Sequence, residues 1–148
     1  MDIVVNKKAR FNYEIFEEIE AGIVLVGTEV KSLRDKKVNL SDSYAVFKKD
    51  ELYLLNARIE PFTHGNVFNH DPLRARKLLL KEKELSKLKG KLLQKGWVML
   101  PMKMYFKNNR WVKVKLGLGK SKKKHDKRQA IREKDIARDT EREMKNYV

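Results

Sequence analysis

The sequence predicts a mainly β protein, a small closed or half-open barrel followed by a basic tail. Two long segments, 98–106 and 112–118, carry a large apolar side chain at every second position, which is the period of a half-buried strand. Helical periodicity is confined to short stretches, so the helical crossovers of a parallel sheet are missing. The 148 residues suffice for one domain with a modest core. We expect a barrel domain at 1–119 and a tail at 120–148.

The first half of the chain alternates between strands and turns. Residues 1–12 are a polar, basic lead-in, and residues 13–25 carry the spaced isoleucines of a strand. Thr28 is the expected N-cap of a short helix over 28–36. A turn at 39–42 then leads to a hairpin, with strands at 44–47 and 52–59 and a loop at 48–51.

The middle of the chain is less regular. Residues 62–71 show no pattern and predict a loop, and Asp71-Pro72 is a helix-start signal. The run 74–80 fits either a strand or a helix. A helix over 82–94 follows, because Leu85, Leu88 and Leu92 recur at helical spacing and Gly96 ends it.

The two alternating segments predict a hairpin whose register fixes its turn. If both apolar rows face one core, a three-residue loop at 108–110 sets Phe106 opposite Val112. The same register sets Tyr105 opposite Lys113 and Lys103 opposite Lys115 on the outer face. An aromatic among lysines on an exposed sheet is a candidate nucleic-acid platform. Outward lysines that only prevent strand aggregation are the open alternative.

Acidic residues gather on the first strand of this basic chain. Strand alternation places Glu14, Glu18 and Glu20 on one face. This row is either a solvated face or a source of one carboxylate that accepts hydrogen bonds from a base edge.

The charge of the chain indicates a polyanionic partner. Lysine and arginine number 35 against 20 acidic residues, a net charge of +15, which favours phosphate-rich RNA. No long apolar run supports a membrane partner, and the N-terminus has no signal-peptide pattern. The chain has no cysteine, which fits a cytoplasmic protein. We expect a monomer without a cofactor.

The tail combines low hydrophobicity with helix signals. Its sparse apolar residues predict a segment that is disordered when free. Asp126 and Gln129 form a capping-box variant. At about 100° per residue, all basic side chains from Lys127 to Lys145 fall within an arc of roughly 160°. We therefore expect the tail to become helical on a polyanion.

Catalytic motifs are weak throughout the sequence. His64, His70 and Asp71 are the one metal-like cluster, and a solvated loop explains them better than a metal site. We expect no catalytic residue and no metal, and a basic nuclease using these histidines is the weakest hypothesis. His125 is either a loop residue among charges or a base-stacking side chain.

Several separate blocks resemble one family. The matching residues are Glu20-Ala21-Gly22, Gly27 to Arg34, Ser41 to Tyr44, Arg76 to Leu80 and Lys122 to Arg128. They are similar in order and spacing to the SsrA-binding proteins, also called small protein B. The resemblance implies an oligonucleotide-binding-like barrel flanked by helices. It also implies binding to the tRNA-like domain of transfer-messenger RNA and ribosome rescue by trans-translation.

The resemblance further implies roles for particular residues and partners. By this resemblance, the RNA-facing residues of the barrel would include Asn6, Arg10, Glu20, Tyr44, Leu79 and Lys113. We also expect RNA contacts from Lys7, Gly22, Lys31, Arg34, Lys77, Tyr105 and Lys115. The tail would enter the decoding centre of the small subunit and the empty mRNA channel through Lys122, Lys123, Lys124, His125, Asp126, Lys127, Arg128, Arg132, Lys134, Arg138, Arg142, Met144 and Lys145. Elongation factor Tu is a further candidate partner in the delivery complex. Another ribosomal or rRNA-binding translation protein of the same barrel class is the alternative.

Overall fold

The computed structural model describes residues 1–62 and 68–122. Its elements, in chain order, are β1 (Asp2–Val5), α1 (Lys7–Asn12), β2 (Tyr13–Ile23), α2 (Gly27–Arg34), β3 (Val38–Asn39), β4 (Tyr44–Lys48), β5 (Glu51–Leu55), β6 (Arg58–Ile59), β7 (Arg76–Leu79), α3 (Glu82–Leu92), β8 (Trp97–Lys107) and β9 (Trp111–Ser121). Among these residues, no helix has the length and hydropathy that a membrane span requires.

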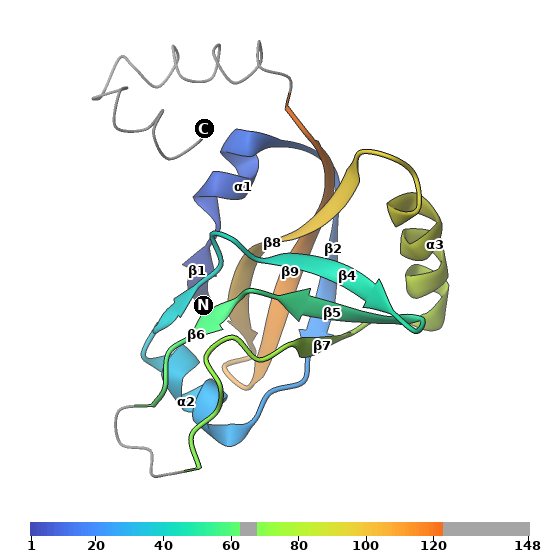
Figure 1. Ribbon diagram of the computed structural model, residues 1–148. Coiled ribbons are helices and arrows are strands. Elements are labelled where there is room, and N and C mark those ends of the chain that lie inside the picture. Colours follow the sequence, from blue (N-terminus) through green and yellow to red (C-terminus); the bar gives the residue numbers. More distant parts are fainter. Residues whose placement is uncertain (63–67, 123–148) are drawn as a thin grey trace, which may run out of the picture.

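Six strands pair into a closed ring (Figure 1). Their order is β8-β4-β5-β7-β2-β9, and the β8–β9 hairpin completes the circle, with every pairing antiparallel. Strand β1 pairs with the C-terminal part of β8, from Lys103 to Tyr105, and β3 and β6 form a separate small sheet. The predicted mainly β architecture of about six strands with short helices is confirmed.

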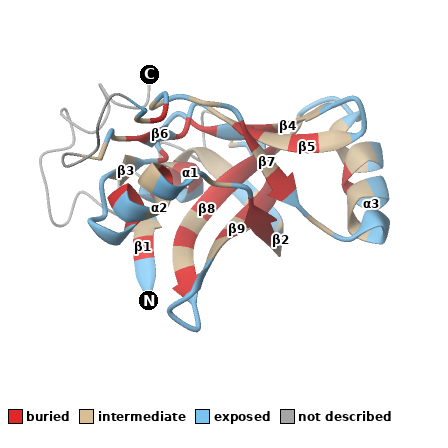
Figure 2. Cartoon of the chain, turned by 90° about the horizontal axis from the view of Figure 1, so that it is seen from below, coloured by how far each residue is buried: buried red, intermediate tan, exposed pale blue. Residues whose placement is uncertain are grey.

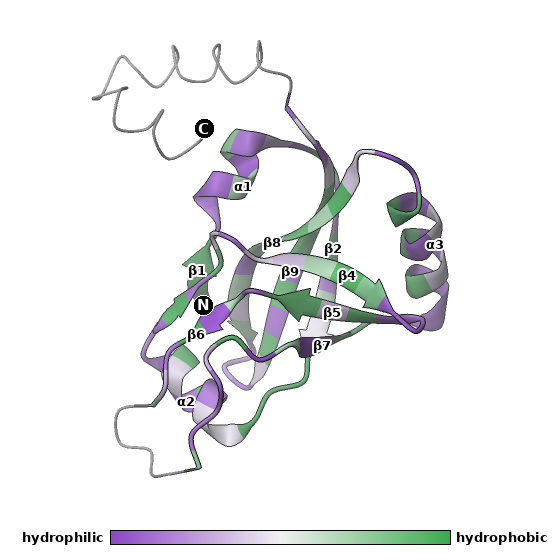
Figure 3. Ribbon diagram, in the orientation of Figure 1, coloured by the Kyte–Doolittle hydropathy of each residue, from purple (hydrophilic) through white to green (hydrophobic). Residues whose placement is uncertain are grey.

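The core fills the inside of this ring. Leu52, Leu54, Met104, Val114 and Leu116 are completely buried, as the alternation of their strands requires. Figure 2 shows buried residues along the strands and a mostly exposed or partly buried α3, while α1 and α2 each bury part of their surface. Leu33 of α2 and Leu88 of α3 belong to the core cluster. Figure 3 shows hydrophobic residues along β4 and β5 and a mainly hydrophilic α1.

The β8–β9 hairpin has the predicted register from its tip to Lys103, but not the predicted single apolar row. A register shift between Pro101 and Lys103 leaves Met104 and Phe106 in the main core and puts Leu100 and Met102 in a second, smaller cluster, so the expectation that all these residues face one core is wrong for Val98, Leu100 and Met102. Phe106 lies opposite Val112 and Tyr105 opposite Lys113, with a three-residue loop at 108–110. Asn108 and Asn109 both have a φ of 55°, a left-handed conformation that asparagine tolerates. The β4–β5 hairpin is also confirmed, although its loop is only Lys49-Asp50, which have the positive φ angles of a tight turn.

Strand β2 contains an irregularity that the sequence pattern does not reveal. Ile15 pairs with Gly119 and Glu17 with Leu118, so Phe16 is an extra residue in β2. Only glycine fits at position 119, because a Cβ there would collide with the backbone carbonyl of Glu14. The bulge reverses the alternation between Glu14 and Glu18. The predicted single row of Glu14, Glu18 and Glu20 is therefore wrong for Glu14.

The N-terminal lead-in is more ordered than predicted. It forms β1 and α1, and the buried Asn6 joins them to the ring. The Asn6 amide donates to the carbonyls of Leu40 and Pro101, while its Oδ1 accepts from the N–H of Ala9. Since these partners lie far along the chain, local sequence could not indicate them.

Two predicted helix starts are also corrected. Helix α2 begins at Gly27 with Val26 at its N-cap, and the Glu29 carboxylate accepts from the Val26 N–H. The Asp71-Pro72 signal marks a turn, because the Asp71 carboxylate accepts from the N–H of Leu73. The ambiguous run 74–80 contains the strand β7, and the predicted helix over 82–94 is confirmed as α3.

A buried ion pair fixes α2 against β7. Glu29 and Arg76 are both fully buried, and Arg76 Nε lies 2.5 Å from Glu29 Oε2. Arg74 adds a second contact at 2.6 Å to Glu29 Oε1. The remaining Arg76 donors reach the carbonyls of Ala57 and Pro72. Every polar group of the pair thus has a partner, which a buried charge requires.

Candidate nucleic-acid interface

One outer face of the ring, which we call the Glu20 face, joins residues of β2, β7, β8 and β9. Its members are Glu20, Gly22, Leu79, Tyr105, Lys107, Lys113 and Lys115. Strand pairing brings them together, since Gly22 lies opposite both Leu79 and Lys113, and Lys115 lies opposite Glu20. Tyr105 lies on the other side of Lys113. Six of the predicted RNA-binding residues therefore share one surface.

The Glu20 carboxylate is the centre of this face. The Tyr105 hydroxyl donates to Glu20 Oε2, and Lys107 Nζ lies 3.0 Å from Oε1. The hydrogen bond from Tyr105, followed by that from Lys107, lowers the pKa of Glu20 below its usual value. Partial burial and the same bond raise the pKa of Tyr105. At neutral pH, Glu20 is thus an ionised acceptor and Tyr105 a neutral donor.

This carboxylate has acceptor capacity left for a ligand. A carboxylate offers about four lone-pair positions, and the described contacts of Glu20 use two of them. Its side chain remains 35% exposed. Glu20 can therefore accept hydrogen bonds from amino groups, which nucleobases present on their edges.

Leu79 covers Gly22 beside Glu20. A Cβ at this position would lie 3.3 Å from Leu79 Cβ and 3.7 Å from Lys113 Nζ. A side chain at this position would force Leu79 to shift by a few tenths of an ångström, while its contact with Lys113 would be an ordinary one. The half-exposed Leu79, which covers the buried Gly22, thus forms an apolar patch next to a cation. Such a patch suits the flat face of a sugar or a base.

Lysines surround this patch. Lys113 and Lys115 form no ion pair with any residue of 1–62 or 68–122. Lys103 lies 3.6 Å from Asp2 and over the Tyr105 ring at 5.4 Å. The face therefore combines one strong acceptor with two cations that are free to contact phosphates.

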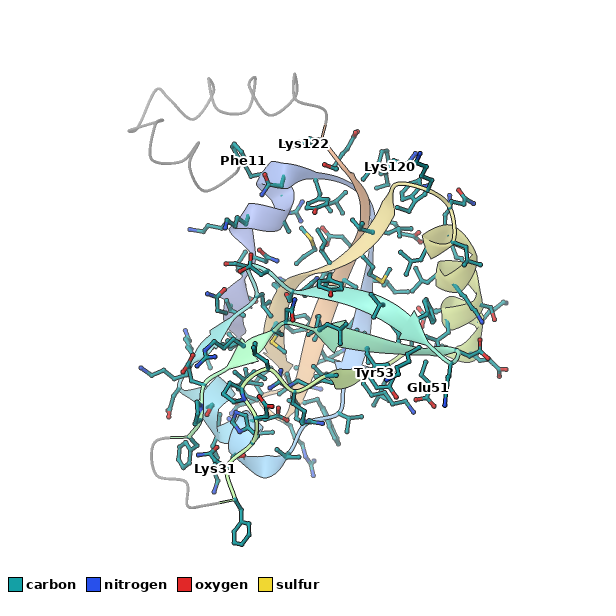
Figure 4. All side chains as sticks on the ribbon, in the orientation of Figure 1. Phe11, Lys31, Glu51, Tyr53, Lys120 and Lys122 are labelled. Carbon is teal, nitrogen blue, oxygen red and sulfur yellow. The ribbon has the colours of Figure 1, made fainter. Side chains whose placement is uncertain are left out.

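Lys77 continues the surface from β7 onto β5. It lies 3.3 Å from Glu51, which also accepts a hydrogen bond of 2.9 Å from Tyr53. The Tyr53 bond, then the Lys77 bond, lowers the pKa of Glu51. Glu51 and Tyr53 lie together on β5 (Figure 4). This trio repeats the chemistry of Glu20, Tyr105 and Lys107.

Helix α2 places its predicted residues beside the hairpin tip. The Arg34 guanidinium lies 4.5 Å from the centre of the Phe106 ring and donates to the carbonyl of Asn109. Lys31 lies over the Phe62 ring at 5.5 Å. Both side chains therefore have neighbours within the protein, and Arg34 keeps its charge beside the tip of the β8–β9 hairpin.

The remaining predicted barrel residues lie apart from the Glu20 face. Tyr44 and Asn6 line a groove of about 920 Å³ between α1, β4 and the start of β8. Tyr44 is exposed, while Asn6 is buried and uses its amide inside the protein. Lys7 and Arg10 lie on α1, where Arg10 pairs with Glu18 at 2.5 Å. The predicted set thus divides into two surfaces.

Comparisons with known proteins give this arrangement a family. Residues 3–146 match the family model described as SmpB protein. The chain belongs to the SmpB family. It is 52% identical over 143 residues to an SsrA-binding protein of Magnetococcus marinus, covering 97% of this chain and 95% of the relative. It is 51% identical over 145 residues to one of Limosilactobacillus fermentum, covering 98% and 92%.

A solved structure agrees with this assignment to the SmpB family. The matching chain comes from work described as tmRNA-SmpB and a journey to the center of the bacterial ribosome. It is 48% identical, covers 87% of this chain and 94% of its own length, and has a TM-score of 0.70. The predicted family resemblance is confirmed.

The family match includes the tail, but most predicted tail residues lie outside the described residues. These are Lys123, Lys124, His125, Asp126, Lys127, Arg128, Arg132, Lys134, Arg138, Arg142, Met144 and Lys145. Lys122 is described, and its N–H donates to the carbonyl of Asn12. Strand β9 runs to Ser121, two residues beyond the predicted domain boundary, so the barrel holds the chain as far as Lys122.

Sequence reasoning missed several members of this SmpB-family surface. Lys107 ends β8 and was not singled out, although its spacing of two from Tyr105 places it on the same face. Glu51 and Tyr53 show the same spacing on β5. The Tyr53–Glu51 bond lies within β5, but the ion pairs of Lys107 with Glu20 and of Lys77 with Glu51 join strands that are distant in sequence, so strand pairing is needed to bring them together.

His70 does not lie in a solvated loop as predicted. It is buried, with Nδ1 2.8 Å from the Thr28 hydroxyl and Nε2 2.8 Å from the Ile59 carbonyl. Both ring nitrogens therefore have partners within the fold. Within 1–62 and 68–122, no group of three metal-ligating side chains gathers. His64 lies outside the described residues.

Proposed function

We propose that this chain binds the tRNA-like domain of transfer-messenger RNA and delivers it to stalled ribosomes for trans-translation. The observation that carries this proposal is the SmpB-family match, which spans residues 3–146 and so includes barrel and tail. The names of the relatives and of the solved neighbour support the same partners. The charge of +15 is suited to two RNA partners.

The Glu20 face is the surface that we assign to transfer-messenger RNA. Its ionised carboxylate can accept from a base amino group, and Lys113 and Lys115 can contact the flanking phosphates. The half-exposed Leu79, above the buried Gly22, leaves an apolar patch between these polar groups. A purely electrostatic surface would need only the lysines, whereas an acceptor among them can select particular bases.

We assign the tail to the ribosome. Strand β9 carries the chain to Lys122, from which the tail can extend into the decoding centre and the mRNA channel. The predicted basic arc matches a channel lined with phosphates, and His125 is proposed to stack on an rRNA base there. Asn6 would support this arrangement indirectly, by holding α1, while Lys7, Arg10 and Tyr44 contact RNA beside the groove.

The finer parts of the proposal follow from the family. We propose a non-enzymatic factor that works in the cytoplasm as a monomer without a cofactor, with elongation factor Tu as a partner during delivery. A search for RNA cleavage with and without divalent metal tests the first point, and metal-dependent cleavage would contradict it.

A peptide-tagging assay on stalled ribosomes tests the proposed function. The full chain should support tagging, while a chain ending at Lys122 should bind transfer-messenger RNA within about threefold and give no tagging. Ending the chain earlier would remove residues that pair with Trp97 and Tyr13, so Lys122 is the cleaner end. Loss of RNA binding together with tagging would contradict this division between barrel and tail.

A comparison of two RNAs separates the proposed function from its alternative. If the protein were a general rRNA-binding factor, the full chain would bind rRNA fragments and transfer-messenger RNA with equal affinity at physiological salt. It would then also fail to support tagging. The SmpB-family proposal predicts both a preference for transfer-messenger RNA and tagging activity.

A further inference from the structure

An aromatic pair lies on the surface at the end of the ring where the tail leaves. The Phe16 ring lies 5.2 Å from the Trp97 ring, with an angle of 62° between their planes. Phe16 is 56% exposed. A large aromatic side chain this exposed contributes little to the core, so its position requires another explanation.

The backbone presents Phe16 outward. Phe16 is the extra residue of the β2 bulge, and bulges redirect side chains at the rims of barrels. Trp97, the first residue of β8, lies opposite Lys120 of β9, which in turn lies opposite Glu14 of β2. Three strands thus meet at this rim.

Two lysines surround the aromatic pair. Lys91 Nζ lies 4.8 Å from the centre of the Trp97 ring, and Lys120 Nζ lies 4.7 Å from the same centre. The two cations come from α3 and β9, so separate elements converge on one indole. Figure 4 places Lys120 and Lys122 at the opposite end of the molecule from Lys31 of α2. We call Phe16, Trp97, Lys91 and Lys120 the rim platform.

We propose that the rim platform is a second RNA-binding site, which holds an unpaired nucleotide. The base stacks on the exposed Phe16 ring, while Lys91 and Lys120 contact the phosphates on either side. Aromatic stacking combined with nearby cations is the usual means of binding single-stranded nucleic acid. The rim platform lies outside the residue set that we assign to transfer-messenger RNA.

The charge of the rim favours RNA over an apolar protein partner. Lys120 lies at the end of β9 and Lys122 comes directly after the strand, and the glutamate nearest to Phe16 in sequence, Glu17, is already paired with Lys87 at 2.7 Å. An apolar partner would have to bury the Lys91 and Lys120 ammonium groups without compensation. Phosphates supply that compensation.

The platform and the Glu20 face lie at opposite ends of one hairpin. Trp97 and Tyr105 are eight residues apart on β8, which corresponds to about 26 Å of strand. The β8–β9 pairing, which runs from Trp97 to Lys107 with one register shift between Pro101 and Lys103, can therefore hold two RNA segments apart. This inference extends the proposed function, since it adds a contact for a second RNA segment where the tail begins.

Tryptophan fluorescence can test the platform in the full-length protein. The chain has two tryptophans, so the Trp111→Phe variant leaves Trp97 as the reporter. A single-stranded RNA of about ten nucleotides should quench Trp97 in a saturable way. In this background, Phe16→Ala should weaken the binding by at least about fivefold, and Phe16→Tyr should preserve it.

Two further variants keep the result interpretable. Leu93→Ala removes an exposed apolar side chain of the adjacent groove without an aromatic ring, and should change the affinity less than twofold. The double variant Lys91→Gln and Lys120→Gln should weaken binding and flatten its salt dependence. Absent quenching, equal losses in Phe16→Ala and Leu93→Ala, or unchanged affinity in Phe16→Ala would overturn the proposal.

The same proteins separate this inference from the proposed function. The affinity of each protein for the tRNA-like domain of transfer-messenger RNA is measured in parallel. If the unmodified chain prefers that RNA but Phe16→Ala binds the short RNA normally, only the rim platform is refuted. If the unmodified chain shows no such preference, the proposed function fails, whatever the short RNA does.

Discussion

Glu29 and Glu20 each accept hydrogen bonds from a cationic side chain, but Glu29 is buried and Glu20 is partly exposed. Burial raises the pKa of Glu29, but hydrogen bonds from Arg74, the Val26 N–H and Arg76 outweigh it, so the net pKa is lowered. The pKa of Glu20 is lowered by Tyr105 and Lys107 at a partly exposed site. The Glu29 and Arg76 side chains are fully buried, whereas those of Glu20 and Lys107 are 35% and 51% exposed. The same chemistry therefore holds the fold together at one site and is proposed to bind a ligand at the other.

The largest effect is expected at the buried pair. Glu29→Gln removes the charge that balances Arg76 and should lower the free energy of unfolding by about 3–5 kcal/mol. That is a large part of the stability of a domain this size. Urea unfolding at neutral pH measures the change, with Glu20→Gln as the matched variant. Similar losses in both variants would contradict the contrast between the sites.

At the exposed pair of Glu20 and Lys107, we expect a smaller change in the free energy of unfolding together with a loss of RNA affinity. Glu20→Gln should change the free energy of unfolding by no more than about 1 kcal/mol, since exposed ion pairs contribute little. Its affinity for transfer-messenger RNA should fall about tenfold, as expected when a base-edge acceptor is lost. Glu60→Gln, which breaks the exposed pair with Arg58, is the control for charge. An equal loss of affinity in the control would argue against base recognition by Glu20.

Lys113 tests whether the Glu20 face contacts RNA phosphates. Lys113→Ala should weaken binding and reduce the slope of log affinity against log salt by about one, because one phosphate contact is lost. Filter binding over a series of salt concentrations measures the slope. Lys87→Ala removes a lysine that is paired with Glu17 on the side of α3 and should leave the slope unchanged. If the slope stays constant in Lys113→Ala, its role is only to keep the strand soluble.

The pH dependence of stability provides a further contrast. The pKa of Glu29 in the folded protein lies below its ordinary value of 4.5. Its stabilising contribution is therefore complete above that value and is lost as the pH falls from about 4.5 through the folded pKa. Thermal unfolding from pH 7 to pH 3 should show a shallower acid decline in Glu29→Gln than in the unmodified chain. Parallel declines would show that other carboxylates determine acid sensitivity.

The sequence predicts the structure best where a single rule, such as the alternation of side chains along a strand, determines the arrangement. The register of the β8–β9 hairpin near its tip follows from alternation, because Met104, Phe106, Val112 and Val114 face the same core. Beyond Lys103 a register shift sends Leu100 and Met102 into a separate cluster, which alternation did not predict. The same reasoning fails for Glu14, since the bulge at Phe16 reverses the alternation of β2. A pattern of period two cannot reveal an inserted residue.

The parts that sequence reasoning missed depend on partners distant in the chain. Helix α1 has only six residues, and Asn6 anchors it to Leu40 and Pro101. Arg76 is completely buried because Glu29, 47 residues earlier, balances its charge. The site was predicted more fully than these features, because the family resemblance named residues that the ring then placed together. The roles of these residues in RNA binding remain predictions.

The most direct test of the account is the selectivity of RNA binding. We predict that the unmodified chain prefers the tRNA-like domain of transfer-messenger RNA to bulk tRNA at physiological salt. Glu20→Gln should lose most of this preference while its free energy of unfolding stays within about 1 kcal/mol of the unmodified value. Equal binding of the two RNAs by the unmodified chain, or full preference in Glu20→Gln, would contradict the assignment of the Glu20 face.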